Sequence, residues 1–212
     1  MDIGGLIVGL GNPGAEYQGT RHNFGFMAIE ALLAECERSA PVARLSGQKD
    51  PFSLWRATLT DSKGTRRDWF MAMPLTYMNR SGEPVQRIAA YYHIEPDQIL
   101  VLHDELDLPL GRMKLKKGGG NAGHNGLKSI QQMLGTPDFF RLRLGIGKPP
   151  GHNGSSWVLS RFASEQREDL EKTIAAAVEG TILFARQGSR KAQQFCNGFS
   201  LESPPDTDSA TP

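Results

Sequence analysis

Three polar side chains of this chain stand where α/β proteins often carry out chemistry. Asn12 follows the apolar run of residues 5–10, His22 begins a helical stripe over residues 22–38, and Asp104 ends the apolar run of residues 98–104. Open α/β sheets bind substrates beyond the carboxyl ends of their strands. A histidine at such a position is a candidate for chemistry, and a carboxylate at a strand end can hold and orient a histidine from another strand. Position alone favours a structural or helix-capping role for His22.

Asp104 lies in a dense acidic segment, His103-Asp104-Glu105-Leu106-Asp107, which raises the alternative of a metal site. A divalent ion needs ligands whose side chains converge on one point. Neighbouring side chains of a strand point to opposite faces, so only His103 and Glu105, or Asp104 alone, can share a direction. We therefore expect no metal, and we prefer a single carboxylate that orients a histidine from another segment.

The segment Gly9-Leu10-Gly11-Asn12-Pro13-Gly14 matches the glycine fingerprint of dinucleotide-binding proteins. In that motif the glycines open directly into a helix whose amides hold the pyrophosphate. Here Asn12-Pro13-Gly14 favours a turn, and about eight residues separate it from the helical stripe. Glu35, about twenty residues on, falls within the helix rather than at a strand end. An NAD-dependent oxidoreductase is therefore a disfavoured alternative.

Two further segments precede predicted helices. Asn79 or Ser81 stands at a strand-to-helix junction and, taken alone, is best interpreted as a helix N-cap. The segment 118–128 has five glycines in nine residues and ends at a helix N-terminus. Glycines permit close approach of a ligand, and free amides at a helix start favour negative charge. A flexible surface loop is the alternative, but anion binding is the preferred interpretation.

Positive charge is concentrated in the middle of the chain, although the net charge is only +1. Between residues 108 and 164 the only acidic residue is Asp138. The same segment carries nine basic residues: Arg112, Lys114, Lys116, Lys117, Lys128, Arg141, Arg143, Lys148 and Arg161. Clustered lysines and arginines attract the phosphates of nucleic acids. An anionic partner and a solvated surface balanced by acids elsewhere explain this segregation equally well.

The segments that must hold these residues alternate between strand and helix patterns. Strands are predicted at residues 5–10, 52–59, 68–73, 98–104, 112–116 and 140–146, with the second and third forming a hairpin. Helical stripes are predicted over 22–38, 85–92, 127–134 and 170–185. Gly135 is the expected C-cap of the third helix, and Ser164 is the expected N-cap of the fourth.

This alternation predicts a single three-layer α/β domain with a mixed, mostly parallel, twisted sheet and helices on both faces. The domain is expected to span residues 1–198, followed by a Ser-, Pro- and Asp-rich tail, 199–212, that is expected to be disordered. With no long apolar segment, the protein is expected in the cytoplasm. Cys36 and Cys196 are expected to be reduced thiols.

Taken together, these segments resemble the bacterial peptidyl-tRNA hydrolases. The matching segments are 9–14, 17–25, 74–82, 103–108, 118–128, 141–147 and 157–162, and they include Thr20-Arg21-His22-Asn23-Phe24-Gly25. They follow the family's order and spacing over about residues 6–198. Where this chain has Asn121-Ala122, the family often carries histidine or glutamate followed by glycine. The resemblance implies an α/β enzyme that hydrolyses the ester between a peptide and its tRNA, without a metal or cofactor.

The resemblance also implies roles for the matching residues. His22 corresponds to the general base, Asp104 to the carboxylate that supports it, and Asn12 to the residue that distinguishes a blocked amino group from a free one. The peptide and the 3′ end of the tRNA would be contacted by Asn79, Asn125, Tyr17, Tyr77 and Met78. The phosphates of the acceptor stem would be contacted by the basic strands 112–117 and 141–143 and by Lys128. The residues of these strands expected to make the contacts include Lys114, Lys116 and Arg143.

The same scaffold could also serve a non-catalytic RNA-binding protein, as in some hydrolase-like relatives. Such a protein would be free to lose Asn12, His22 or Asp104, and this chain retains all three. Hydrolysis of peptidyl-tRNA is therefore the preferred hypothesis. No cofactor, membrane or obligate protein partner is expected, and the family implies a monomer.

Overall fold

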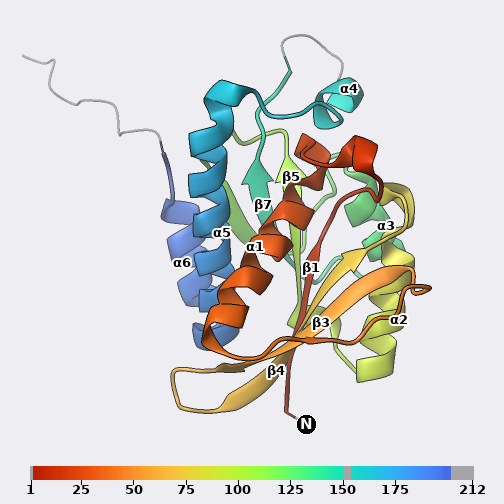
Figure 1. The fold of residues 1–212 in the computed structure, drawn as a ribbon, viewed down its shortest axis with the longest axis vertical. Helices are drawn as coiled ribbons and strands as arrows, with labels where there is room; N and C mark the ends of the chain where they lie inside the picture. The colour runs from red at the N-terminus through yellow and green to blue at the C-terminus, as the bar shows by residue number, and fades with distance from the viewer. Residues whose placement is uncertain (1, 150–153, 202–212) are drawn as a thin grey trace, which may run out of the picture.

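The computed structural model describes residues 2–149 and 154–201, and within them seven strands form one sheet (Figure 1). The strands are β1 (Ile3–Gly9), β2 (Ala43–Arg44), β3 (Phe52–Thr60), β4 (Arg66–Pro74), β5 (Ile99–Glu105), β6 (Met113–Lys117) and β7 (Phe140–Gly145). Their order across the sheet is β2-β3-β4-β1-β5-β7-β6. β4, β1, β5 and β7 run parallel to one another, whereas β3 and β6 run antiparallel to their neighbours. The sheet is mixed and mostly parallel, as predicted.

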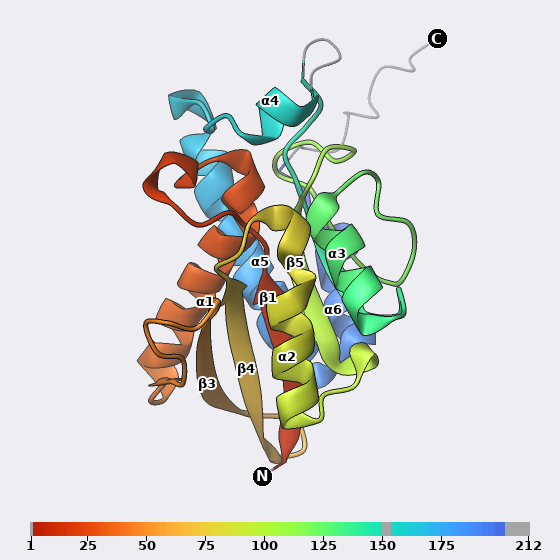
Figure 2. The ribbon, with the colours of Figure 1, turned by 90° about the vertical axis from the view of Figure 1, so that its right-hand side faces the viewer.

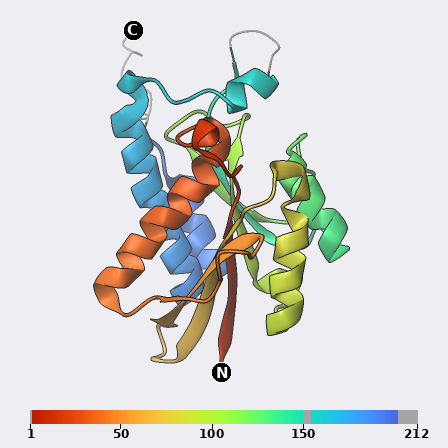
Figure 3. The ribbon, with the colours of Figure 1, turned by 45° about the vertical axis from the view of Figure 1, so that its right-hand side comes forward.

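Helices cover both faces of the sheet and complete a three-layer domain (Figure 2, Figure 3). They are α1 (Phe24–Ser39), α2 (Gly82–Tyr92), α3 (Asn125–Leu134), α4 (Gly154–Val158), α5 (Arg167–Gln187) and α6 (Ser189–Gly198). One core lies between the sheet and α1, α5 and α6, and includes Ile29, Leu102 and Ala177. The other lies under α2 and α3 and includes Val101 and Ile130. Among the described residues, no helix combines the length and apolarity that a membrane span needs.

The carboxyl ends of the parallel strands meet at one edge of the sheet. β1 leads to Asn12, β4 leads to Met78, and β5 contains Asp104 near its end. After β1 the chain continues into α1 on one face, and after β4 it continues into α2 on the other face. Helices that leave neighbouring strands toward opposite faces open a crevice between them, which is where α/β sheets bind ligands.

The start of α5 corrects one prediction. Ser164 is not the N-cap of this helix, because the chain first forms a 3-10 turn over Ser164–Gln166 and α5 begins at Arg167. The side chain of Gln166 accepts a hydrogen bond from the backbone N–H of Ala163 at 3.2 Å, which closes this turn. The Ser164 hydroxyl instead donates to Glu165 at 2.9 Å.

Helix α6 and the residues after it cover the outer edge of β6. Asn197 accepts a hydrogen bond from the backbone N–H of Leu115 at 2.8 Å and donates to its carbonyl at 3.4 Å. The N–H of Leu201 donates to the carbonyl of Gly111 at 3.0 Å. Only Ala192 and Cys196 of α6 are buried. The sequence therefore shows no long apolar stripe over these residues, and the helix was not predicted. Residues 202–212 of the predicted tail lie outside the described residues.

The glycines near the end of β1 allow this strand to pack closely against α1. A Cβ atom at Gly9 would lie 2.3 Å from the carbonyl oxygen of Gly25. After Gly14 the chain forms two 3-10 turns, Ala15–Tyr17 and Arg21–Asn23, and α1 begins only at Phe24. These glycines therefore bring strand and helix together and do not open a helix onto a pyrophosphate. The dinucleotide-binding interpretation is wrong for this reason.

Gly25→Ala should lower the free energy of unfolding by about 3 kcal/mol, because the added methyl group would clash with backbone atoms that cannot move aside. The added Cβ would lie 2.3 Å from the Leu102 carbonyl oxygen and 2.4 Å from the Leu10 nitrogen. Urea unfolding measures the loss. Gly198→Ala is the matched control, because a Cβ there meets nothing within 4 Å. Equal stabilities of the two variants would contradict the packing argument.

Candidate active site

A cavity of about 600 Å³ opens at the carboxyl ends of β1, β4 and β5. Its lining includes seven predicted site residues: Asn12, His22, Tyr77, Met78, Asn79, Asp104 and Asn125. The loop 121–124 and helix α4 supply further walls. A groove of about 620 Å³ between α1 and α5 is similar in size, but alanine, branched aliphatic and mostly charged polar side chains line it, without a histidine or an asparagine. The chemistry of the lining, rather than its size, marks the first cavity as the candidate active site.

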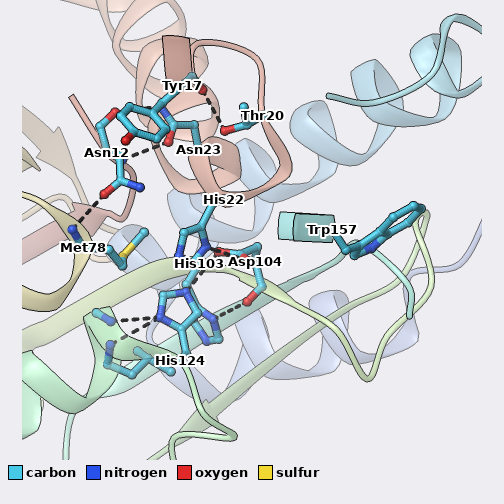
Figure 4. A network of polar contacts seen from close by, with 12 residues as sticks. Asn12, Tyr17, Thr20, His22, Asn23, Met78, His103, Asp104, His124 and Trp157 are labelled. Atoms are coloured by element: carbon cyan, nitrogen blue, oxygen red, sulfur yellow. Dashed lines mark hydrogen bonds and ion pairs between the residues drawn. The ribbon is translucent and has the colours of Figure 1, made fainter. Parts of the chain in front are cut away.

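The imidazole of His22 meets the carboxylate of Asp104 at the wall of this cavity (Figure 4). Nδ1 of His22 lies 3.0 Å from each carboxylate oxygen. An ionised carboxylate can only accept, so Nδ1 carries a proton and donates it, which leaves Nε2 as the basic nitrogen. The bond to Asp104, rather than a bond to a helix amide, holds the ring. The helix-capping interpretation of His22 is therefore wrong.

A second histidine, His124, holds the same carboxylate from the opposite helical layer. Its Nε2 lies 3.0 Å from Oδ1 of Asp104. Its Nδ1 accepts hydrogen bonds from the backbone N–H groups of Gly126 and Leu127, at 3.2 and 3.4 Å, as the N-cap of α3. Because Nδ1 accepts, the ring proton resides on Nε2 and is donated to Asp104. These amides are therefore occupied, and they are not free for the anion that the glycine-rich segment suggested.

The environment keeps Asp104 ionised although its side chain is almost completely buried. Burial alone would raise the pKa of this carboxyl. The electrostatic attraction and hydrogen bond of the His124 imidazole, followed by those of His22, act in the opposite direction and hold the pKa of Asp104 below its usual range. A fixed negative charge thus lies between two imidazole donors.

His22, Asp104 and His124 are close enough together to resemble a metal site, with ligand atoms within 4.8 Å of one another. A histidine that binds a metal through one nitrogen normally donates its other ring N–H to a protein acceptor. Nδ1 of His124 instead accepts from two backbone amides. The hydrogen-bond pattern therefore fits proton transfer and does not fit metal ligation.

Asn12 is held so that its amide nitrogen remains available. Its backbone N–H donates to Oδ1 of Asn23 at 2.9 Å, and Nδ2 of Asn23 donates to its carbonyl at 3.0 Å. Its own Oδ1 accepts from the N–H of Met78 at 2.8 Å. Figure 4 shows the amide nitrogen turned away from Met78, on the side of His22. Asn12 therefore presents a hydrogen-bond donor in the cavity that His22 also lines.

Arg21, the residue before His22, binds the segment that contains and follows α4. Its Nη1 donates to the Ser160 hydroxyl at 2.7 Å, and its Nη2 donates to Gln166 at 2.8 Å. The guanidinium also stacks on Trp157, 3.8 Å from the ring centroid. These contacts fix the cavity wall relative to His22. Nothing in the sequence alone gave Arg21, Asn23 or His124 a role, and their adjacency to His22 and Asn125 was the available signal.

The predicted phosphate contacts lie outside the main cavity. Lys114 on β6 and Lys128 on α3 are exposed, and Lys116 is half-buried. Arg143 is 19% exposed and donates to Glu105 at 2.7 Å. Tyr17 is half-buried in the turn before His22 and is also absent from the cavity lining.

Arg141 does not face solvent, so the prediction that it contacts phosphate is wrong. Strand alternation places Arg141 and Arg143 on the same face of β7, but the glycine-rich loop covers Arg141 completely. Its Nη1 donates to the carbonyl of Gly120 at 2.8 Å. A charge buried in this way supports the protein interior rather than an exposed nucleic-acid contact.

Two predictions about the loops also change. Ser81 stands at the N-cap of α2 but makes no capping bond, and its hydroxyl donates to the carbonyl of Met78 at 2.9 Å. Asn79 is exposed in the cavity rather than serving as a cap. Ala122 has a φ of 45°, in the left-handed region that favours glycine. The alanine therefore stands at a position whose backbone suits a glycine.

His103 lies directly beneath this network, fully buried on β5. Its Nδ1–H donates to the backbone carbonyl of Asp104 at 2.7 Å, and its ring centroid lies 5.0 Å from that of His124. Burial, with a smaller electrostatic contribution from the neighbouring His124, lowers the pKa of His103 to about 3. The ring is therefore neutral at physiological pH.

Comparisons with known proteins agree with this geometry. Residues 6–204 match the family model described as peptidyl-tRNA hydrolase. A peptidyl-tRNA hydrolase from Nitratidesulfovibrio vulgaris (strain DSM 19637 / Miyazaki F) is 55% identical over 94% of this chain and 98% of its own. One from Oleidesulfovibrio alaskensis is 53% identical over 95% of this chain and 100% of its own. The crystal structure of peptidyl-tRNA hydrolase from Acinetobacter baumannii superposes with a TM-score of 0.82 at 35% identity, covering 94% of this chain and 98% of that one.

The lowered pKa of His103 predicts an acid-sensitive contribution to stability. The unfolded chain takes up a proton near pH 6.5, whereas the folded chain resists it until about pH 3. Stability from the neutral ring is thus present above pH 6.5 and is lost as the pH falls toward 3. His103→Asn keeps a donor for Asp104 but cannot titrate. Urea unfolding between pH 7 and 4 should show the wild type losing up to about 1.4 kcal/mol more per pH unit than the variant. If the stabilities of the wild type and the variant fell equally with pH, the lowered pKa of His103 would be contradicted.

Proposed function

The chain belongs to the peptidyl-tRNA hydrolase family and hydrolyses the ester bond of peptidyl-tRNA, and we propose that it does so with a water molecule activated by His22. The observation that carries this proposal is the 3.0 Å bond between Nδ1 of His22 and Asp104 in the wall of the cavity. This bond fixes the tautomer in which Nε2 is a base, and it stabilises the imidazolium that forms when the base takes a proton.

In the proposed reaction, Nε2 of His22 removes a proton from water while the oxygen attacks the ester carbonyl. The carbon–oxygen bond to the terminal ribose then breaks, and His22 returns the proton to the ribose oxygen. The products are a free peptide carboxyl group and a tRNA hydroxyl group. Asp104 does not take the proton; its role is to orient and stabilise the imidazole. His124 supports the reaction indirectly, because its Nε2–H holds the carboxylate.

Asn12 is proposed to recognise the peptide side of the substrate. Its Oδ1 is engaged by Met78, so Nδ2 is the group that can donate to a substrate carbonyl or to the developing oxyanion. Asn79 and Asn125 line the same cavity and offer donors and acceptors to peptide groups of any sequence. Tyr77 is 60% exposed at its rim, beside the buried Met78, and would give the 3′ end of the tRNA a surface to pack on.

The tRNA acceptor stem is proposed to lie against the basic edge formed by β6, β7 and α3. Lys114 pairs directly opposite Arg143 across the two strands, so the two cations share one face. Lys116 and Lys128 extend the positive surface. Contacts of this kind recognise phosphate and shape rather than base sequence. Tyr17, in the turn before His22, is proposed to contact the 3′ end.

We also propose that the protein acts as a cytoplasmic monomer without a cofactor. Every residue in the proposed mechanism comes from one chain, so a second copy has no chemical part to supply. A non-catalytic RNA-binding protein would have no use for the tautomer control that Asp104 imposes on His22. That alternative is therefore disfavoured.

His22→Ala should lower kcat for peptidyl-tRNA by about 10²–10⁴-fold, because it removes the general base. Binding of uncleaved substrate should remain close to that of the wild type, since the basic edge is untouched. Single-turnover hydrolysis and filter binding measure the two quantities. His93→Ala, at an exposed position outside the cavity, is the control. A fully active His22 variant would remove this residue from the mechanism.

Asn12→Asp should lower kcat/KM for N-acetyl-aminoacyl-tRNA by about 10²–10³-fold, because it removes the donor and adds a charge. The acceptor for Met78 is kept in this variant, so the melting temperature should change little. The wild type should cleave the acetylated substrate and leave free aminoacyl-tRNA intact. Equal rates for the wild type and the variant would show that Nδ2 of Asn12 makes no productive contact.

A further inference from the structure

A small cavity of about 30 Å³ lies behind the candidate active site, under the glycine-rich loop. Three of the residues that line it carry buried polar atoms without a partner among the described residues. These atoms are Nε2 of His103, Oδ1 of Asn121, and Nε and Nη2 of Arg141. An unpaired buried polar atom is costly, so four of them around one cavity indicate that the cavity is built for a ligand.

The hydrogen-bonding character of these four atoms identifies the ligand. The Nδ1–H of His103 is donated to the Asp104 carbonyl, so its Nε2 is an acceptor. Nδ2 of Asn121 donates to Gln131 at 2.8 Å, so its Oδ1 is also an acceptor. Nε and Nη2 of Arg141 are donors. Two donors and two acceptors match the two lone pairs and two hydrogens of one water molecule.

The size of the cavity agrees with this assignment. A buried water molecule needs a cavity volume of roughly 10–15 Å³ and two to four polar partners, and this cavity has about 30 Å³. An anion could accept from Arg141, but it would face the lone pairs of His103 and Asn121 without a proton to donate. Water is therefore favoured over an anion.

We propose that this cavity binds an internal water molecule, and that Arg141 acts through it as a positioning residue for the Asp104–His124 pair. The proposal rests on the proposed hydrolytic function and adds a residue to it. Arg141 lies in the interior, so its contribution is separate from any contact with tRNA.

The path from Arg141 to the site is short. Its Nη1 holds the carbonyl of Gly120, and the water would join it to Asn121, the next residue of the loop. Three residues later the loop reaches His124, whose Nε2 must lie 3.0 Å from Asp104. The water would also contact His103, whose ring packs against His124. A misplacement of about 1 Å in such an arrangement can cost about 10²-fold in rate.

The kinetic test separates positioning from tRNA binding. Arg141→Gln should lower kcat by about 10–10²-fold, while KM and the salt dependence of tRNA binding stay at the wild-type values. A weaker salt dependence with unchanged kcat would overturn the proposal, because it would make Arg141 a phosphate contact. Thr173→Val removes another buried polar group far from the site and should lower stability without lowering kcat.

A second variant guards against misfolding of the first. Asn121→Ala removes the acceptor in the cavity together with the bond to Gln131, whereas Gln131→Ala removes only that bond. The Asn121 variant should lose about tenfold in kcat relative to the Gln131 variant. Equal kcat values for the two variants would overturn the proposal.

A high-resolution crystal structure of the full chain supplies a readout that does not depend on activity. It should show one water within hydrogen-bonding distance of Arg141, His103 and Asn121. An empty cavity, or an anion in it, would overturn the assignment. Hydrolysis by the wild type and its loss in His22→Ala test the proposed function itself, so failure of the water assignment leaves that function intact.

Discussion

The structure depends on one buried carboxylate. Asp104 lies at the end of a central strand, and a negative charge at that depth is tolerated only when it is paired and hydrogen-bonded. His22 reaches it from the turn before α1, and His124 reaches it from the N-cap of α3. The two histidines belong to opposite helical layers, so the carboxylate joins the layers above the end of the sheet. The close contact between Gly9 and Gly25 also positions His22, because it sets how closely the start of α1 packs against β1.

His124 connects the formation of a helix with the chemistry of the site. Its Nδ1 closes the first turn of α3, and the same bonds determine that Nε2 carries the proton given to Asp104. A helix cap and the donor that holds Asp104 are therefore set by one ring. His103 makes the complementary choice, because its Nδ1 is the donor and its Nε2 faces the small cavity. His22 and His103 thus carry the ring proton on Nδ1 and His124 carries it on Nε2, and each tautomer is determined by a backbone or carboxylate partner.

Local patterns in the sequence predicted the sheet, the long helices and the segments that form the cavity, because alternation and helical stripes report which faces are buried. They also placed His22 and Asp104 at strand and helix ends that meet. They could not show that Arg141 is covered while Arg143 is half-buried, since both residues lie on one face of the strand and only the loop distinguishes them. The role of His124 depends equally on tertiary contact. Ser164 misled because a serine before a stripe suits a 3-10 turn as well as a helix cap.

The amide of Asn197 has a consequence beyond local packing. β6 is an outermost strand of the sheet, and such strands offer unpaired backbone groups to other chains. Asn197 occupies both backbone groups of Leu115, and Leu201 occupies the carbonyl of Gly111. Strand addition by a second molecule, the first step toward domain swapping or fibril growth, is therefore blocked at this margin. The exposed lysines of β6, Lys114 and Lys117, therefore lie on a strand that does not offer these backbone groups to a second copy of the chain.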